Sequence, residues 1–256
     1  MGNETKKIND DPDFNRMRSS NYLGSIGVER VFGKHHKVSI NGFYEGIDIR
    51  DDTTRYVAKT SYSNLPHFYK NNGFAGVNVD YLYQVLNDSI LPTKGISFLT
   101  GAEFTNNLRN SKNSFARFTT EANIYVPLTK KFVLALKAAG STLVGNPLFY
   151  QYNNIGGSET LRGYRRERYY GNSTAYAQNE LQWISPVHSY LYNGKIGFFA
   201  LYDIGRVWLD GESSDKWHSG YGGGIILCPY NLITASVSYA VSADGNNVHI
   251  QLIKAF

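Results

Sequence analysis

Hydrophobic and polar side chains alternate over long stretches of this 256-residue chain. In residues 117–126, one face would carry Phe118, Thr120, Ala122, Ile124 and Val126, and the other Arg117, Thr119, Glu121, Asn123 and Tyr125. A period of two places successive side chains on opposite faces of a β-strand. About eleven segments show this pattern, and none shows the period of an amphipathic helix. The segments lie near 20–32, 36–49, 73–86, 95–107, 114–126, 132–143, 173–184, 195–208, 218–228, 231–241 and 247–256. The sequence therefore predicts an all-β, antiparallel fold.

A soluble β-sandwich also alternates, but three features favour a transmembrane β-barrel. The segments run to about 10–14 residues, whereas soluble strands average about 5–6. Short connections, as at 126–131, alternate with long ones, as at 51–71 and 145–172, which is typical of membrane barrels. Aromatic residues lie near segment ends, where membrane interfaces favour them. These are Tyr22, Tyr83, Phe104, Trp183, Trp208 and Phe256.

The composition limits the other possibilities. Residues 1–18 are charged and show no period, so we expect a polar tail or linker there and the barrel in residues 19–256. A single cysteine, Cys228, excludes an internal disulfide and a multi-cysteine metal site. The formal net charge of +5 permits nucleic-acid binding, but the basic residues outside one loop are scattered. We therefore expect no nucleic-acid partner.

That loop, Gly156–Gly171, concentrates four arginines, Arg162, Arg165, Arg166 and Arg168. A guanidinium inside a barrel needs a carboxylate to offset its desolvation. The period-two pattern points Asp203 and Glu180 inward, so a loop folded back into the lumen would bring Arg162 to one of them. Gly163 would let the backbone turn sharply and approach the wall. For the other three arginines we predict a solvated outer loop.

Leu161-Arg162-Gly163-Tyr164 resembles the (Val/Leu/Ile)-Arg-Gly-(Phe/Tyr) signature of the outer-membrane protein assembly factor superfamily, also called the bacterial surface antigen family. That family includes BamA-like insertases and two-partner secretion transporters. Three further matches follow the family order. They are Pro92-Thr93-Lys94-Gly95, Glu180-Leu181, and Tyr202-Asp203-Ile204-Gly205 followed by Val207-Trp208.

The resemblance implies that the signature lies in a loop tucked into the barrel, with Arg162 on an inner-wall acid, Asp203 and also Glu180. It implies the bacterial outer membrane as the location. Phe256 would be the terminal signal read by the outer-membrane assembly machinery. Lys254 interrupts the apolar face of that last segment, and Gln251 stands where the family often has glycine.

Two departures from the family bear on the architecture. Family barrels have sixteen strands and usually carry periplasmic domains before them, whereas about eleven or twelve strands are visible here. The chain would be either a complete smaller barrel of about twelve strands or, as we favour, the C-terminal part of a longer polypeptide. The polar start of the chain, which resembles no signal peptide, points the same way.

Two functions remain open. The first is an outer-membrane barrel that assists insertion or transport of polypeptides, with lipid, polypeptide clients and the assembly machinery as partners. The second is a passive pore, or an anchor for a separate N-terminal domain. We expect no cofactor, no metal and no enzymatic activity, because the six histidines lack ligand spacing and nothing marks Ser238 and His249 as a pair. The glycines of 220–224 resemble a phosphate loop only in composition, and close strand packing explains them better.

Overall fold

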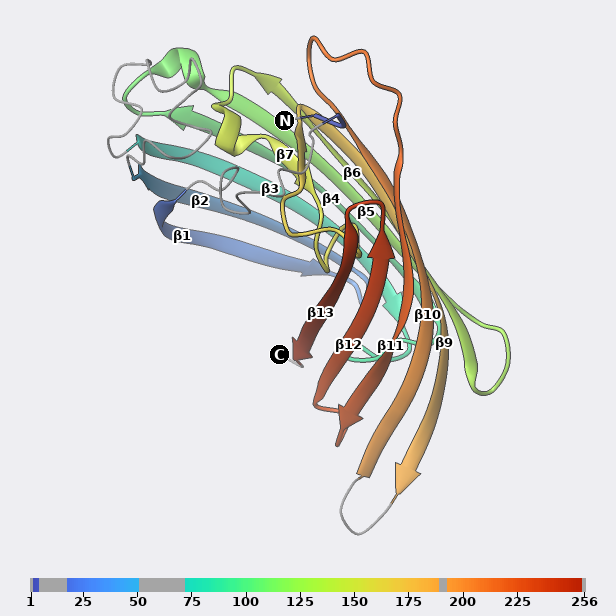
Figure 1. Ribbon diagram of the computed structural model, residues 1–256. Helices are drawn as coiled ribbons and strands as arrows, with labels where there is room; N and C mark the ends of the chain where they lie inside the picture. Colours follow the sequence, from blue (N-terminus) through green and yellow to red (C-terminus); the bar gives the residue numbers. More distant parts are fainter. Residues whose placement is uncertain (1, 5–17, 51–71, 189–192, 255–256) are drawn as a thin grey trace.

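Eleven long strands form one antiparallel sheet in the computed structural model, which describes residues 2–4, 18–50, 72–188 and 193–254 (Figure 1). The strands are β1 (Ser19–Phe32), β2 (His36–Ile49), β3 (Asn72–Leu86), β4 (Gly95–Asn107), β5 (Phe115–Pro127), β6 (Phe132–Gly145), β9 (Ser173–His188), β10 (Asn193–Trp208), β11 (His218–Pro229), β12 (Ile233–Ser242) and β13 (Gly245–Lys254). Each strand pairs with the next along the sheet, and all the pairings are antiparallel. The predicted fold class is confirmed.

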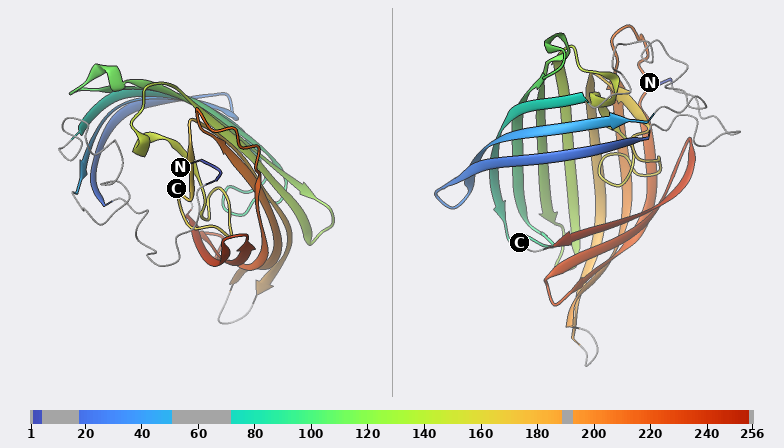
Figure 2. Two further views of the ribbon diagram at one scale, coloured as in Figure 1. Left: turned by 45° about the horizontal axis from the view of Figure 1, so that its top comes forward. Right: turned by 90° about the vertical axis from the view of Figure 1, so that its left-hand side faces the viewer.

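The sheet curls into a barrel wall with a concave inner side (Figure 2). β1 and β13 are its edge strands, and among the described residues no ladder joins them. Connections 33–35, 87–94, 128–131 and 230–232 lie at one end of the wall, called the turn end. Connection 146–172 leaves from the other end, called the loop end.

The strand register confirms the two predicted faces. Ala122, Ala138 and Ala177 face each other across β5, β6 and β9 on the outer side. Asn123 and Lys137 are opposite each other on the inner side. Large apolar side chains are exposed along the outer face, among them Ile26, Phe104, Phe198, Tyr221 and Ile250. Lipid would cover such a surface in a membrane, whereas a sandwich would pack it against a second sheet.

Strand limits agree with the sequence pattern at most ends. The segments predicted at 36–49 and 95–107 coincide with β2 and β4. The largest difference is at β9, which passes Pro186 and continues to His188. β9 pairs with β6 only as far as Trp183 and afterwards with β10 alone. Proline is tolerated there because one side of the strand has become an edge.

Small elements inside the connections were not predicted. A two-stranded sheet pairs β7 (Asn153–Ile155) with β8 (Tyr169–Gly171) inside the long loop. Two short 3-10 helices, η3 (Ser111–Asn113) and η4 (Phe149–Gln151), lie in connections. Neither is long enough to cross a membrane, and no longer helix occurs in the described parts of the chain.

A charged residue on the outer face should cost more than one on the inner face. We expect Ala122→Arg to lower the free energy of unfolding by about 2–4 kcal/mol, the range for arginine at the lipid midplane of a barrel. Asn123→Arg is the matched control, because its side chain would face Glu121, which already accepts a hydrogen bond from Asn123 at 2.9 Å. Urea unfolding in lipid vesicles measures both losses, and equal losses would contradict the assignment of faces.

Candidate functional site

The connection between β6 and β9, residues 146–172, folds back into the concave side of the sheet (Figures 1 and 2). We call it the arginine loop and residues 157–164 its tip. The loop carries its own small core, in which Ile155, Leu161, Tyr164 and Tyr169 pack with Val207 of β10. Gly157 and Leu161 exchange two backbone hydrogen bonds of 3.1 Å, which shape the tip. The loop therefore enters the lumen as a folded unit.

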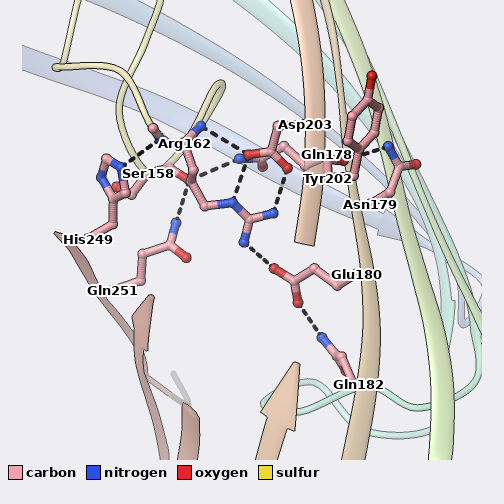
Figure 3. A network of polar contacts seen from close by, with 11 residues as sticks. Ser158, Arg162, Gln178, Asn179, Glu180, Gln182, Tyr202, Asp203, His249 and Gln251 are labelled. Carbon is pink, nitrogen blue, oxygen red and sulfur yellow. Dashed lines mark hydrogen bonds and ion pairs between the residues drawn. The ribbon is translucent and has the colours of Figure 1, made fainter. Parts of the chain in front are cut away.

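Arg162 at the tip meets Asp203 of β10 (Figure 3). Its Nε and its backbone N–H donate to Asp203 Oδ2 at 2.8 and 3.0 Å, and its Nη2 donates to Oδ1 at 2.7 Å. Both carboxylate oxygens are thus engaged by one residue. This two-pronged geometry requires a guanidinium, because an ammonium presents a single point of charge.

Glu180 of β9 binds the remaining end of the guanidinium through Nη1. Its second oxygen accepts a hydrogen bond of 2.6 Å from Gln182 Nε2 on the same strand. The site therefore holds two carboxylates and one guanidinium. Both carboxylates face this one cation, so removing Arg162 would leave two negative charges facing the same space.

Burial makes this contact a strong constraint. Asp203 is 0% exposed and Arg162 is 2% exposed. Burial by itself would lower the pKa of the Arg162 guanidinium, but the hydrogen bonds and charges of Asp203 and Glu180 raise it above its usual value. The pair therefore stays ionised, and losing one partner would strand a buried charge.

Two glycines allow the tip to approach the wall. Gly163 has a φ of 92°, in the left-handed region that glycine adopts without strain. Gly220 of β11 lies directly below the tip, where a Cβ would stand 1.9 Å from the carbonyl oxygen of Arg162. Gly220, one of three inward glycines in the 220–224 run, thus leaves room for the tip of the loop.

The edge strand β13 holds the other side of the tip through three alternate inward side chains. Gly163 N–H donates to His249 Nε2 at 3.0 Å, and Asn247 Nδ2 donates to the Gly163 carbonyl at 2.7 Å. Gln251 Nε2 donates to the Ser158 carbonyl at 3.0 Å. We call Asn247, His249 and Gln251 the β13 clamp.

Other wall residues complete the attachment. Ser242 Oγ also donates to the Gly163 carbonyl, at 2.7 Å, and Gln178 Nε2 of β9 donates to the Ser158 carbonyl at 3.0 Å. Tyr164 is buried, and its hydroxyl donates to the Ser219 carbonyl at 3.3 Å. The tip is thus bound to β9 and β10 on one side and to β11–β13 on the other.

The structure separates the remaining arginines of the loop. Arg165 and Arg166 are exposed, and the Arg166 side chain is 88% exposed. Arg168 is not solvated, so that part of the prediction is wrong. It forms an ion pair with Asp244 of the β12–β13 turn, and its guanidinium lies 4.6 Å from the centre of the Tyr169 ring. The curvature of the sheet brings that turn to the loop. The alternation of inward and outward residues along each strand does not predict this contact.

Other candidates from the sequence have different outcomes. Phe256 lies outside the described residues. Ser238 and His249 are opposite each other on β12 and β13, but they face the lumen and His249 Nε2 is engaged by Gly163. Within the described ranges, no group of three or more His, Cys, Asp or Glu side chains is placed to hold a metal ion.

Sequence reasoning missed the β13 clamp and Gln178. Their only signal is the alternation of polar residues in Asn247-Val248-His249-Ile250-Gln251, which marks an inward face without naming a partner. Hydrogen bonds to backbone atoms of the tip leave no complementary residue type in the sequence of the loop.

Known proteins match the chain in sequence and in structure. A sequence model of the Omp85 superfamily domain matches residues 3–252. BamA from Haemophilus ducreyi, in a crystal structure lacking POTRA domains 1–3, is similar with a TM-score of 0.71 and 18% identity over 92% of this chain and 54% of that one. CdiB from Escherichia coli is similar with a TM-score of 0.61 and 17% identity over 94% of this chain and 46% of that one. The chain thus spans about half the length of these two structures.

Removing the guanidinium should destabilise the docked loop strongly. We expect Arg162→Ala to lower the free energy of unfolding by about 3–5 kcal/mol, because it leaves the Asp203 carboxylate buried without a partner. Arg162→Lys should restore only part of the loss, since lysine cannot bind both oxygens in the same plane. Arg166→Ala is the control in the same loop and should change little. Urea unfolding in vesicles measures these values, and equal effects of the two alanine variants would contradict the site.

Filling the space below the tip should undock the loop without removing any charge. In Gly220→Val, the new side chain would overlap the Arg162 carbonyl. We expect protease sites in residues 157–164 to become accessible in intact vesicles, while the strand content by circular dichroism stays unchanged. Gly24→Val is the control, because a Cβ at that position of β1 meets no atom within 4 Å. Protection of the tip in Gly220→Val would contradict the close approach.

Proposed function

The chain belongs to the Omp85 superfamily, and from this premise we propose that it assists the insertion or transport of polypeptides at the outer membrane. The family places it in the bacterial outer membrane as a β-barrel of the assembly and transport type. The finer role, which covers clients, partners and route, is our proposal. Its proposed partners are outer-membrane lipid, polypeptide clients and the outer-membrane assembly machinery.

The observation that carries the proposal is the docking of the arginine loop on Asp203 and Glu180. A passive pore needs a clear lumen, and this lumen holds a folded segment tied to β9, β10, β11, β12 and β13 by charge and hydrogen bonds. An anchor for another domain has no need for a buried ion pair in its interior. We call the docking of Arg162 on Asp203 and Glu180 the lock. Such a fixed contact is useful where one part of the wall must stay rigid while another part exchanges partners.

The edge strands are the part that can exchange partners. In the part of the chain that the structure describes, β1 and β13 each have one neighbour in the sheet, which leaves one row of backbone groups on each for pairing. Their outward side chains are strongly exposed, with Ile26 at 85% and Ile250 at 68%. An extended client segment can add to such an edge by backbone hydrogen bonds.

The β13 clamp would couple the lock to this edge. Asn247, His249 and Gln251 face inward and hold the tip, while Val248, Ile250 and Leu252 between them face outward. Docking of the loop therefore restrains the strand on which a client segment would pair. We propose that the loop keeps β13 in the shape that receives a client.

A client-insertion assay tests the proposal. The full chain in lipid vesicles should speed the folding of an unfolded outer-membrane barrel protein, and Arg162→Ala should lower that rate about tenfold or more, since each 1.4 kcal/mol lost from docking changes the docked-to-undocked ratio tenfold. Arg166→Ala should keep the full rate. No acceleration by the unaltered chain, together with a high conductance in planar bilayers, would instead support the passive pore.

A further inference from the structure

The β3–β4 connection, residues 87–94, does not stay at the rim of the barrel. It has eight residues, against three or four in the other described connections at the turn end. Ile90 and Leu91 at its centre are each only 5% exposed. Connections normally run over the surface, so burial of two large apolar side chains in a turn requires a receiving surface. We call residues 87–94 the turn plug.

Side chains of the plug hold it in a defined shape. Asp88 Oδ1 accepts hydrogen bonds from the backbone N–H groups of Ile90 at 2.9 Å and Leu91 at 3.3 Å. Asn87 Oδ1 accepts from the N–H groups of Thr93 at 3.0 Å and Lys94 at 2.9 Å. These contacts replace strand pairing across the turn and project Ile90 and Leu91 together.

The receiving surface lies across the barrel interior. Ile90 and Leu91 belong to one apolar cluster with residues of β6 and β9–β12, most of which point inward. These partners are Val133, Ile184, Phe199, Leu201, Ile226, Cys228 and Ala240. Along the sheet, β5, β6 and β9 separate β4 from β10. The plug therefore reaches across the lumen to strands that are not its neighbours in the sheet.

Two polar contacts fix the plug on this surface. Lys195 Nζ of β10 binds Asp88 Oδ2 at 2.8 Å, and Thr234 Oγ1 of β12 donates to the Ile90 carbonyl at 3.1 Å. Burial would raise the pKa of Asp88, but the Lys195 ammonium and the backbone N–H groups of Ile90 and Leu91 outweigh it and lower the pKa overall. Asp88 is thus an ionised carboxylate that is shared between shaping the plug and anchoring it.

The plug and the arginine loop meet around one residue. The guanidinium carbon of Arg162 lies 5.9 Å from the centre of the Phe199 ring, and Phe199 is a member of the cluster that receives Ile90 and Leu91. The loop thus fills the lumen from the loop end and the plug fills it from the turn end. The apolar patch around Phe199 receives the two buried apolar side chains of the plug, Ile90 and Leu91.

We propose that residues 87–94 form a second plug, which closes the turn-end mouth of the lumen and must leave its site before a polypeptide can pass through. Closure of the mouth does not depend on the proposed function, whereas the role of the plug in polypeptide passage rests on the proposed function. The surface left behind would present a lysine, a threonine hydroxyl and an apolar wall. Such a surface suits an incoming extended segment that carries an acidic residue next to apolar ones.

Conductance in planar bilayers tests closure without any client. Asp88→Lys and Lys195→Asp should each raise the conductance of the full chain several-fold, because each places like charges where the ion pair now lies. Lys195→Arg keeps a cation beside Asp88 and leaves the Asp88 hydrogen bonds to Ile90 and Leu91 in place, so it should keep the low value. Lys94→Ala, at an exposed position of the same turn, is the matched control. Unchanged conductance in both charge-reversed variants, or an equal rise in Lys94→Ala, would overturn the plug.

A crosslinking measurement keeps the proposal testable if a charge variant fails to fold. Cysteines at Asp88 and Lys195, in a Cys228→Ala background that keeps the receiving surface apolar, should be joined by a short bifunctional thiol reagent in intact membranes. A cysteine pair at Lys94 and Lys195 should react much less, and equal reaction of both pairs would overturn the plug. Joining the first pair should leave edge-dependent client insertion intact. If the chain without substitutions does not speed client insertion, that result would count against the proposed function alone.

Discussion

The structure depends on one buried carboxylate. Asp203 faces the interior of a curved sheet at zero exposure, where an unpaired negative charge would be very costly. Its compensation comes from Arg162, about forty residues earlier in the chain, so that part of the wall depends on the β6–β9 connection being docked inside. The glycine at 220, the left-handed turn at Gly163 and the small core around Leu161 all serve to bring one guanidinium to that place.

The lock is asymmetric, and this has consequences for the edge. β9 and β10 bind the tip mainly through charge, with little freedom in direction, whereas β13 binds it through neutral amide and imidazole groups. Charged contacts in a dry site are strong and fix position. Neutral hydrogen bonds contribute less each, so the β13 side is the one from which the tip can separate first. The rigid wall and the adaptable edge therefore follow from the chemistry of their contacts with the same loop.

Much of this could be predicted from the sequence, for local reasons. Strand parity is set by nearest neighbours, so the alternation in 117–126 and 231–241 was enough to assign faces, and it also placed Asp203 and Glu180 inward. The tetrapeptide at 161–164 pointed to the loop only through a family resemblance. What parity cannot supply is the curvature of the sheet, which brings β13, Asp244 and the 87–94 turn to segments far from them in the chain. Hence the β13 clamp, the Arg168–Asp244 pair and the burial of Ile90 and Leu91 escaped prediction.

The two segments inside the barrel bear on the route that a client can take. The arginine loop is held by ion pairs and hydrogen bonds, and the plug is held mainly by apolar burial, so no single change of charge would release both. A polypeptide entering the lumen would have to displace both, whereas the free backbone edges of β1 and β13 are available while both stay docked. In the state described by the structure, pairing at the edge therefore meets less resistance than passage through the lumen. If the proposed function holds, the filled interior would support the wall while its edge exchanges partners.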